Sequence, residues 1–505
     1  MGGQRPLARR RRRRRLPRRH GTPSRSPALL HPLKPNLVFI LTDQQRWDTL
    51  GLVGGPPAET PNLDALARSG TLFTSAYTPC PSCIAARASI FTGQRPTTHG
   101  RLGYRDQVPW RYPVTLTGEL ARAGYQTHCV GKTHFFPQRL PLGFASQDSY
   151  EAAQNFDGQY VNDYWEWLKE RTQGRIHETD HGVDWNSWYS RPSHLPEELH
   201  NNTWVVTKGI EFLERRDTAR PFFLHLSFHR PHPPIDPPHV FFDLFRDRPM
   251  PKVPVGDWAK GNLTPVAGMN APFGQAPKEL LLRARRAYLA QVAHIDNQIG
   301  RFLMFLRRHS GGNPTWIIFA SDHGEMLGDH GLFRKCLAYE GSAHIPFIIA
   351  GPSPSRIHQC AAPVSLEDLM PTFLEAASLP APASVEGRSV LPLLSSTPAE
   401  VGWREYVHGE HSPHYAKGTG MQFLTDGKEK YIWFTLSGKE QLFDLRKDPQ
   451  ELHDLARAKA NRARLALWRA RMIRELAARP QDGLSDGKQL IPGKELPAVR
   501  PALLS

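Results

Sequence analysis

Four apolar runs of strand length are each followed at once by polar side chains that could bind ions. The runs are residues 36–42, 125–130, 222–228 and 315–320, and the side chains after them are Asp43 and Gln44, Lys132 and His134, His229 and His232, and Asp322 and His323. In a doubly wound sheet, ligands bind beyond the carboxyl ends of the strands. We therefore expect a shared site, although a single Asp or His at such a position is usually a turn, cap or surface residue.

The chemistry of these residues favours a divalent cation beside an anion. The two aspartates and Gln44 offer oxygen ligands and His323 adds an imidazole, a set that suits Ca²⁺, Mg²⁺ or Mn²⁺ better than structural zinc. The other side chains, together with Lys335, would add positive charge and proton donors. An anionic substrate is the expected partner of such a site.

A cysteine opens a predicted helix in the stretch Cys83-Ile-Ala-Ala-Arg87. Residues 84–91 have helical character, so Cys83 would lie at or near the helix N-terminus, where the macrodipole and free N–H groups favour an anion. Arg87 is four residues further on and would share a helix face with Cys83. The other interpretation, a redox or metal CxxC at residues 80–83, lacks a second CxxC and a thioredoxin-like context.

These residues need a frame of alternating strands and helices. Helices are predicted at residues 61–68, 116–123 and 278–308, with Thr60 as the N-cap of the first, and a further strand at residues 346–350. This alternation predicts an α/β fold with a doubly wound, mostly parallel sheet and helices on both faces.

Four segments are expected along the chain. They are an arginine-rich disordered tail at residues 1–34, a catalytic domain at 35–400, a smaller C-terminal α+β domain with antiparallel strands at 401–480, and a tail at 481–505. Residues 140–200 are rich in aromatic residues and predict an irregular insertion, either a wall of the site or a self-packed flap. In the C-terminal domain, Asp426-Gly427 predicts a hairpin, and residues 452–478 predict a charged helix.

Charge is concentrated at the N-terminus of the 505-residue chain. The net charge is +16, and residues 1–34 supply most of it through eleven arginines and one lysine, so the rest is near neutral. The like charges of the arginine block repel one another. The block could be a nucleic-acid arm, a targeting signal or a dispensable extension, and the last interpretation is favoured. No signal-type apolar segment follows and no run approaches a membrane span, so the cytoplasm is the expected location. Five cysteines do not make a disulfide framework.

The cysteine stretch resembles the signature of the type I sulfatases of the alkaline phosphatase superfamily, whose bacterial members include arylsulfatases, choline sulfatases and phosphonate monoester hydrolases. Residues 83–93 satisfy every fixed position of the pattern Cys-x-(Pro/Ala)-x-Arg-x4-Thr-Gly. Residues 124–134 are similar to the second family signature, except that Thr133 stands where an aromatic residue, Met or Lys is usual. Further similar segments, among them Pro231-His232-Pro233 and residues 321–335, extend the resemblance over residues 35–460.

The resemblance implies hydrolysis of a small organic sulfate ester to inorganic sulfate and an alcohol. It implies that a formylglycine-generating enzyme oxidises Cys83 to Cα-formylglycine. One hydroxyl of the hydrated aldehyde would attack sulfur, and the other would then expel sulfate, which a plain thiolate could not do easily.

The resemblance also implies roles for the site residues. One divalent ion, Ca²⁺, Mn²⁺ or Mg²⁺, would be held by Asp43, Gln44, Cys83, Asp322 and His323. Arg87 would steady the hydrate, and Lys132, His232 and Lys335 would bind the sulfate group. The leaving oxygen would be protonated by His232 or His134, with His232 favoured and His229 a third choice.

Two other functions stay open. The first is a phosphonate monoester or phosphodiester hydrolase with the same formylglycine and metal site, which the pair Lys132 and His134 modestly disfavours. The second is a non-catalytic protein that binds nucleic acid through its basic tail. The near-neutral remainder of the chain argues against it, and neither a specific nucleic-acid partner nor a membrane partner is expected.

Overall fold

A strand of eight buried residues, β1 (Asn36–Asp43), forms the middle of the main sheet. Its side chains alternate between two hydrophobic cores: Phe39 and Leu41 belong to one, and Val38 and Ile40 to the other. This period of two is the geometry of an extended chain. Because both faces of the strand are buried, its sequence is an uninterrupted apolar run.

The computed structural model, which describes residues 1–3, 34–152 and 160–504, has an eight-stranded main sheet of order β5-β4-β6-β1-β7-β8-β2-β9. The other strands are β2 (Thr71–Phe73), β4 (Gln126–Gly131), β5 (Ser146–Ser149), β6 (Phe222–Pro231), β7 (Thr315–Ser321), β8 (Phe347–Ala350) and β9 (Gln359–Cys360). The five strands from β5 to β7 are parallel, and β8 is antiparallel to both of its neighbours. The predicted mostly parallel sheet is therefore confirmed.

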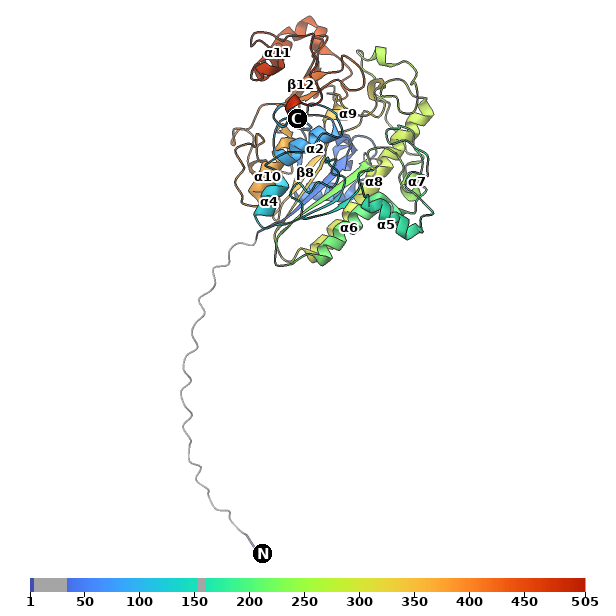
Figure 1. Ribbon diagram of the computed structural model, residues 1–505, viewed down its shortest axis with the longest axis vertical. Helices are drawn as coiled ribbons and strands as arrows, with labels where there is room; N and C mark the ends of the chain where they lie inside the picture. Colours follow the sequence, from blue (N-terminus) through green and yellow to red (C-terminus); the bar gives the residue numbers. More distant parts are fainter. Residues whose placement is uncertain (4–33, 153–159, 505) are drawn as a thin grey trace, which may run out of the picture. The chain divides into compact units, whose positions relative to one another are not determined.

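Helices cover both faces of this sheet (Figure 1). One face carries α2 (Cys83–Thr92), α4 (Leu116–Arg122) and α10 (Leu369–Ala376). The other carries α1 (Pro61–Ser69), α5 (Asp163–Thr172), α6 (Asn201–Arg215) and α8 (Lys278–His309), with α7 (His239–Phe245) outside α8. Smaller elements are β3 (Ala76–Tyr77), β10 (Val364–Ser365), α3 (Pro96–His99) and α9 (Glu340–Ala343). Within the described residues, every helix is too short or too polar to cross a membrane.

The structure differs from the sequence prediction in two details of the strands and helices. Helix α1 begins at Pro61 as expected, but the Thr60 hydroxyl does not cap it: it accepts a hydrogen bond from the Gly51 N–H and donates one to Asp64. The expected irregular insertion contains regular elements within its described residues, because β5 adds a strand to the sheet edge beside β4, and the Asn162 side chain caps α5.

A second sheet is antiparallel and consists of β11 (Val407–His411), β12 (Met421–Thr425), β13 (Glu429–Phe434) and β14 (Glu440–Asp444). The predicted hairpin joins β12 to β13, with Gly427 at a φ of 78°. The helix α11 (Arg462–Ala477) packs on this sheet but starts ten residues later than predicted. The Asp454 carboxylate accepts hydrogen bonds from the Leu442 and Ala456 N–H groups, and such bonds compete with helix formation.

The described residues from Lys34 onward form one compact unit. The predicted disordered tail at residues 1–34 lies almost wholly outside the described residues. Residues 481–504, expected as a tail, lie against the rest of this unit: Leu484 and Val499 are buried, and Ala498 O accepts a hydrogen bond from the Leu102 N–H.

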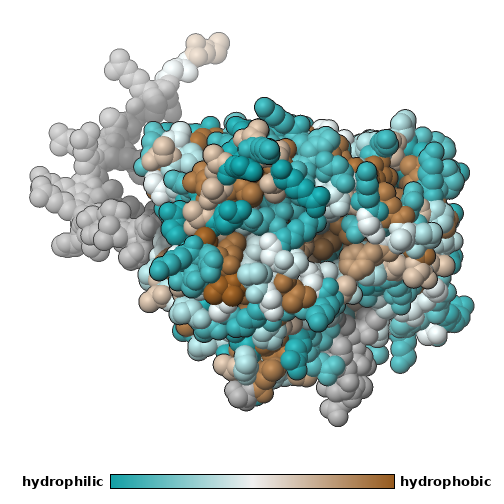
Figure 2. All heavy atoms as spheres, turned by 90° about the horizontal axis from the view of Figure 1, so that it is seen from above, coloured by the Kyte–Doolittle hydropathy of each residue, from teal (hydrophilic) through white to brown (hydrophobic). Residues whose placement is uncertain are grey.

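The face seen in Figure 2 is mainly hydrophilic, and its hydrophobic residues form small separate patches. Most large apolar side chains of the described chain are buried. Isolated apolar residues at a surface are ordinary and need no partner.

Lys430 holds the second sheet to the catalytic part of the chain. Its ammonium group is fully buried and lies 2.6 Å from a Glu340 oxygen and 3.0 Å from a Glu451 oxygen. Burial and the neighbouring Glu340 raise the pKa of Glu451 to about 7. Although burial opposes it, Lys430 lowers the pKa of Glu340 to about 2.

Replacing Lys430 by Met should destabilise the protein by about 3 kcal/mol at pH 8, since two buried carboxylates would lose their cation. The loss should shrink towards pH 5, because both carboxylates can then take up protons in the folded state. Thermal unfolding at the two pH values measures this, with the exposed neighbour Lys428→Met as control. An equal loss at both pH values would contradict it.

Candidate active site

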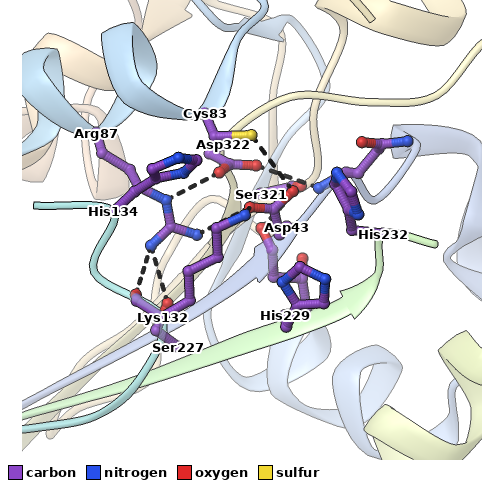
Figure 3. A network of polar contacts seen from close by, with 12 residues as sticks. Asp43, Cys83, Arg87, Lys132, His134, Ser227, His229, His232, Ser321 and Asp322 are labelled. Carbon is purple, nitrogen blue, oxygen red and sulfur yellow. Dashed lines mark hydrogen bonds and ion pairs between the residues drawn. The ribbon is translucent and has the colours of Figure 1, made fainter. Parts of the chain in front are cut away.

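The residues singled out after the four strands meet at one edge of the main sheet. Asp43 ends β1, Lys132 directly follows β4, His232 directly follows β6, and Asp322 directly follows β7. Helix α2 begins at Cys83 in front of this edge (Figure 3). Parallel strands place their carboxyl ends on the same side of a sheet, so the topology alone collects these side chains.

Four buried side chains form a compact group of potential metal ligands: Asp43, Cys83, Asp322 and His323. One donor atom from each lies within 4.8 Å of all the others. The Cys83 Sγ is 3.2 Å from His323 Nε2 and 3.7 Å from Asp43 Oδ1. Burial and the adjacent Asp43 raise the pKa of Asp322 to about 6. Two buried carboxylates this close favour a cation between them.

Arg87 ties the two carboxylates to the neighbouring loop. Its guanidinium is fully buried, with Nε 3.1 Å from Asp322 Oδ2 and Nη2 3.3 Å from Asp43 Oδ2. Its Nη1 donates to the Lys132 carbonyl at 2.7 Å and to the Ser227 hydroxyl at 3.0 Å (Figure 3). These bonds fix the carboxylates before any ligand arrives.

Two lysines flank the cysteine. Lys132 Nζ is 2.7 Å from Asp43 Oδ2, and Lys335 Nζ is 3.3 Å from Cys83 Sγ. Although burial and Asp43 oppose it, these lysines and His323 lower the pKa of Cys83 well below its usual value. Lys335 also donates to Gln44 Oε1 at 2.7 Å, which places Gln44 at the margin of the ligand group. The site is therefore built to hold negative charge at residue 83.

The histidines near the site differ in their partners. His134 Nε2 is 3.1 Å from Asp106 Oδ1, and although burial and Lys132 lower its pKa, Asp106 and Cys83 outweigh them and raise it. His232 Nδ1 contacts the Pro233 carbonyl at 2.9 Å, and burial and Lys335 hold its pKa well below the usual range. Burial and Lys132 likewise lower the pKa of His229.

A cavity of about 230 Å³ gives access to these groups. It is lined by Cys83, Tyr104, Lys132, His134, Glu151, Ala152, Trp185, Asn186, His229, His232, Arg334, Lys335, His414 and Tyr415. No sequence motif marks Glu151 or Asp106, which lie in loops, while Trp185 lies in the aromatic-rich segment at residues 140–200. A second cavity of about 840 Å³ is lined by Asp184 and Ser187, among others, and by none of the clustered ligands.

Comparisons with known proteins agree with this arrangement. The family model described as Sulfatase matches residues 35–379. The chain belongs to the sulfatase family. It is therefore an enzyme, a hydrolase of the alkaline phosphatase superfamily. A second model, N-sulphoglucosamine sulphohydrolase, C-terminal, matches residues 328–477.

Individual relatives cover most of this sulfatase. Arylsulfatase of Clostridium perfringens (strain 13 / Type A) is 42% identical over 91% of this chain and 98% of its own length. Choline-sulfatase of Rhizobium meliloti (strain 1021) is 30% identical over 84% of this chain and 82% of its own. The crystal structure of phosphonate monoester hydrolase of Agrobacterium radiobacter has a TM-score of 0.74 at 26% identity, covering 88% of this chain and 96% of that one.

Proposed function

We propose that this sulfatase hydrolyses sulfate esters of small aromatic alcohols, using a formylglycine at position 83 and one divalent ion. The observation that carries the proposal is the buried group of Asp43, Cys83, Asp322 and His323 at the cavity, flanked by two lysines. The cavity is small, and Tyr104, Trp185 and Tyr415 line it, as do the imidazoles of four histidines. Such walls suit a single aromatic ring.

The residues present fit a divalent ion. Asp43 and Asp322 supply carboxylate oxygens, His323 an imidazole nitrogen, and residue 83 a fourth ligand, all of them buried. An oxygen-rich set with one imidazole suits Ca²⁺ or Mn²⁺, with Mg²⁺ the third candidate. When bound, such an ion supplies positive charge that polarises the oxygens of nucleophile and substrate.

The position of residue 83 suits a covalent nucleophile. After conversion by a formylglycine-generating enzyme, a hydrated aldehyde there supplies the hydroxyl that attacks sulfur. The first turn of α2 presents it, and Lys335 lies within hydrogen-bonding distance of its side chain. Arg87 holds the flanking carboxylates in place from the next turn of the same helix.

The lysines and histidines divide the remaining tasks. Lys132 and Lys335 bind sulfate oxygens and offset charge that grows in the transition state. His134, whose ion pair with Asp106 keeps a proton available, donates it to the leaving oxygen. The sequence favoured His232 for that step, but burial and Lys335 hold the pKa of its imidazole well below the usual range, so we assign His232 to contact with the sulfate group.

The second candidate function is phosphonate monoester or phosphodiester hydrolysis, favoured by the fold similarity to a phosphonate monoester hydrolase. A sulfate monoester offers three non-bridging oxygens to the donors around residue 83. A phosphonate monoester replaces one of these oxygens with an apolar group, which would leave a buried donor without a partner.

Initial rates on 4-nitrophenyl sulfate and 4-nitrophenyl phenylphosphonate decide between them. We expect kcat/KM for the sulfate to be higher by about 100-fold, the size of effect produced by an unpaired buried donor. The protein should be co-expressed with a formylglycine-generating enzyme. A preference for the phosphonate would assign the second function instead.

A further inference from the structure

A buried carboxylate beside the active-site cavity receives hydrogen bonds from the loop that carries Lys132 and His134. Glu151 is 1% exposed and lines the cavity. Its Oε1 accepts from the Thr133 N–H at 2.7 Å, the Thr133 hydroxyl at 2.5 Å and the His134 N–H at 2.9 Å. Its Oε2 accepts from the same His134 N–H at 3.1 Å.

The sheet topology brings these two segments together. Strand β5 pairs with β4 in parallel, with Ser149 opposite Gly131, and the Tyr150 N–H donates to the Gly131 carbonyl at 3.2 Å. The chain therefore leaves both strands side by side. The Glu151 N–H donates to the Tyr160 hydroxyl at 3.0 Å, which fixes the backbone from which the carboxylate extends.

The loop needs such support because of its conformation. His134 has a φ of 60°, in the left-handed region that a residue with a Cβ adopts only at a cost. Two successive N–H groups that point at one anion form a compact binding nest, which stabilises that turn. The turn directs the Lys132 ammonium to Asp43 and the His134 imidazole to Asp106.

We propose that Glu151, together with the Thr133 hydroxyl, is a positioning residue that holds His134 and Lys132 in their reactive places. The proposal rests on the proposed function. The Thr133 hydroxyl gives the carboxylate one more donor beside the two backbone N–H groups, a donor that an apolar side chain such as Val lacks.

The test compares Thr133→Val, Thr133→Ser and Glu151→Gln in the full-length, matured enzyme. Asp148→Asn is the matched control, since this carboxylate lies three residues earlier in β5 and pairs with His128 instead. Rates are measured on 4-nitrophenyl sulfate and on an unactivated alkyl sulfate, with melting temperatures alongside. A displaced catalytic group costs about 100-fold, so kcat of Thr133→Val and Glu151→Gln should fall by about that factor.

Four further results are expected. KM on 4-nitrophenyl sulfate should stay within about twofold, because the aromatic side chains of Tyr104, Trp185 and Tyr415 that line the cavity are unchanged, and Thr133→Ser should restore kcat to near the wild-type value. The loss should be larger for the alkyl sulfate, whose poorer leaving group depends more on the proton from His134. Asp148→Asn should match the wild type.

Two outcomes would overturn the proposal. One is a lower melting temperature with unchanged kcat, which would make the contact merely structural. The other is an equal loss on both substrates with no rescue by Thr133→Ser. Failure of the proposed function is distinguishable, because the wild-type enzyme would then not hydrolyse either sulfate.

Discussion

Replacing Cys83 by alanine should abolish sulfate release. The Cys83 Sγ lies among the donor atoms of His323 and both carboxylates, and Lys335 Nζ is 3.3 Å away from it. Loss of a covalent nucleophile costs at least about 10⁴-fold in kcat, so the variant should fall to the background rate. The measurement is the initial rate on 4-nitrophenyl sulfate, with matured protein.

Cys80→Ala is the matched control for this substitution. Cys80 lies in the loop three residues before Cys83 and is also buried, but burial and Glu410 raise its pKa well above the usual value, so it stays an inert thiol. Its activity should remain within about twofold of wild type. Turnover retained in Cys83→Ala would contradict the covalent scheme, and so would a fully active enzyme whose peptide mass shows an unmodified cysteine.

The positions of the ligand groups follow from local sequence, and this part was predictable. Asp43 and Asp322 each come directly after an apolar run, and a parallel sheet places the ends of such runs at one edge. Cys83 and Arg87 share a helix face through their spacing. Local sequence patterns alone therefore predict that these site residues lie close together.

The surroundings of His134 depend on contacts between distant segments, which no local sequence pattern predicts. Strand β5 reads Ser-Gln-Asp-Ser, which has no apolar alternation, and it is a strand because β4 offers it a free edge. The pairing of β5 with β4 is what brings Glu151 next to His134. Asp106 reaches His134 from a loop 28 residues away, and its charge, rather than any motif, distinguishes His134 from His232.

Removal of the divalent ion should have the second large effect. Chelation should inactivate the enzyme, because Asp43 and Asp322 would then face each other without the cation that their arrangement favours. Returning Ca²⁺ or Mn²⁺ at about 1,000 times its dissociation constant stabilises the folded state by about 4 kcal/mol, so the melting temperature should rise by several degrees. This shift is a readout that needs no turnover.

The size of the shift should depend on pH. Burial and Asp43 raise the pKa of Asp322 to about 6, so protons compete with the ion below that value, and the shift should be smaller at pH 5 than at pH 8. Asp322→Asn should remove most of it. Asp296→Asn should preserve it, since that buried carboxylate, whose pKa burial also raises to about 6, binds Asn62 and Leu63 instead. A chelated enzyme that keeps both its activity and its melting temperature would show that these carboxylates hold no ion, and that Arg87, Lys132 and His323 balance their charge instead.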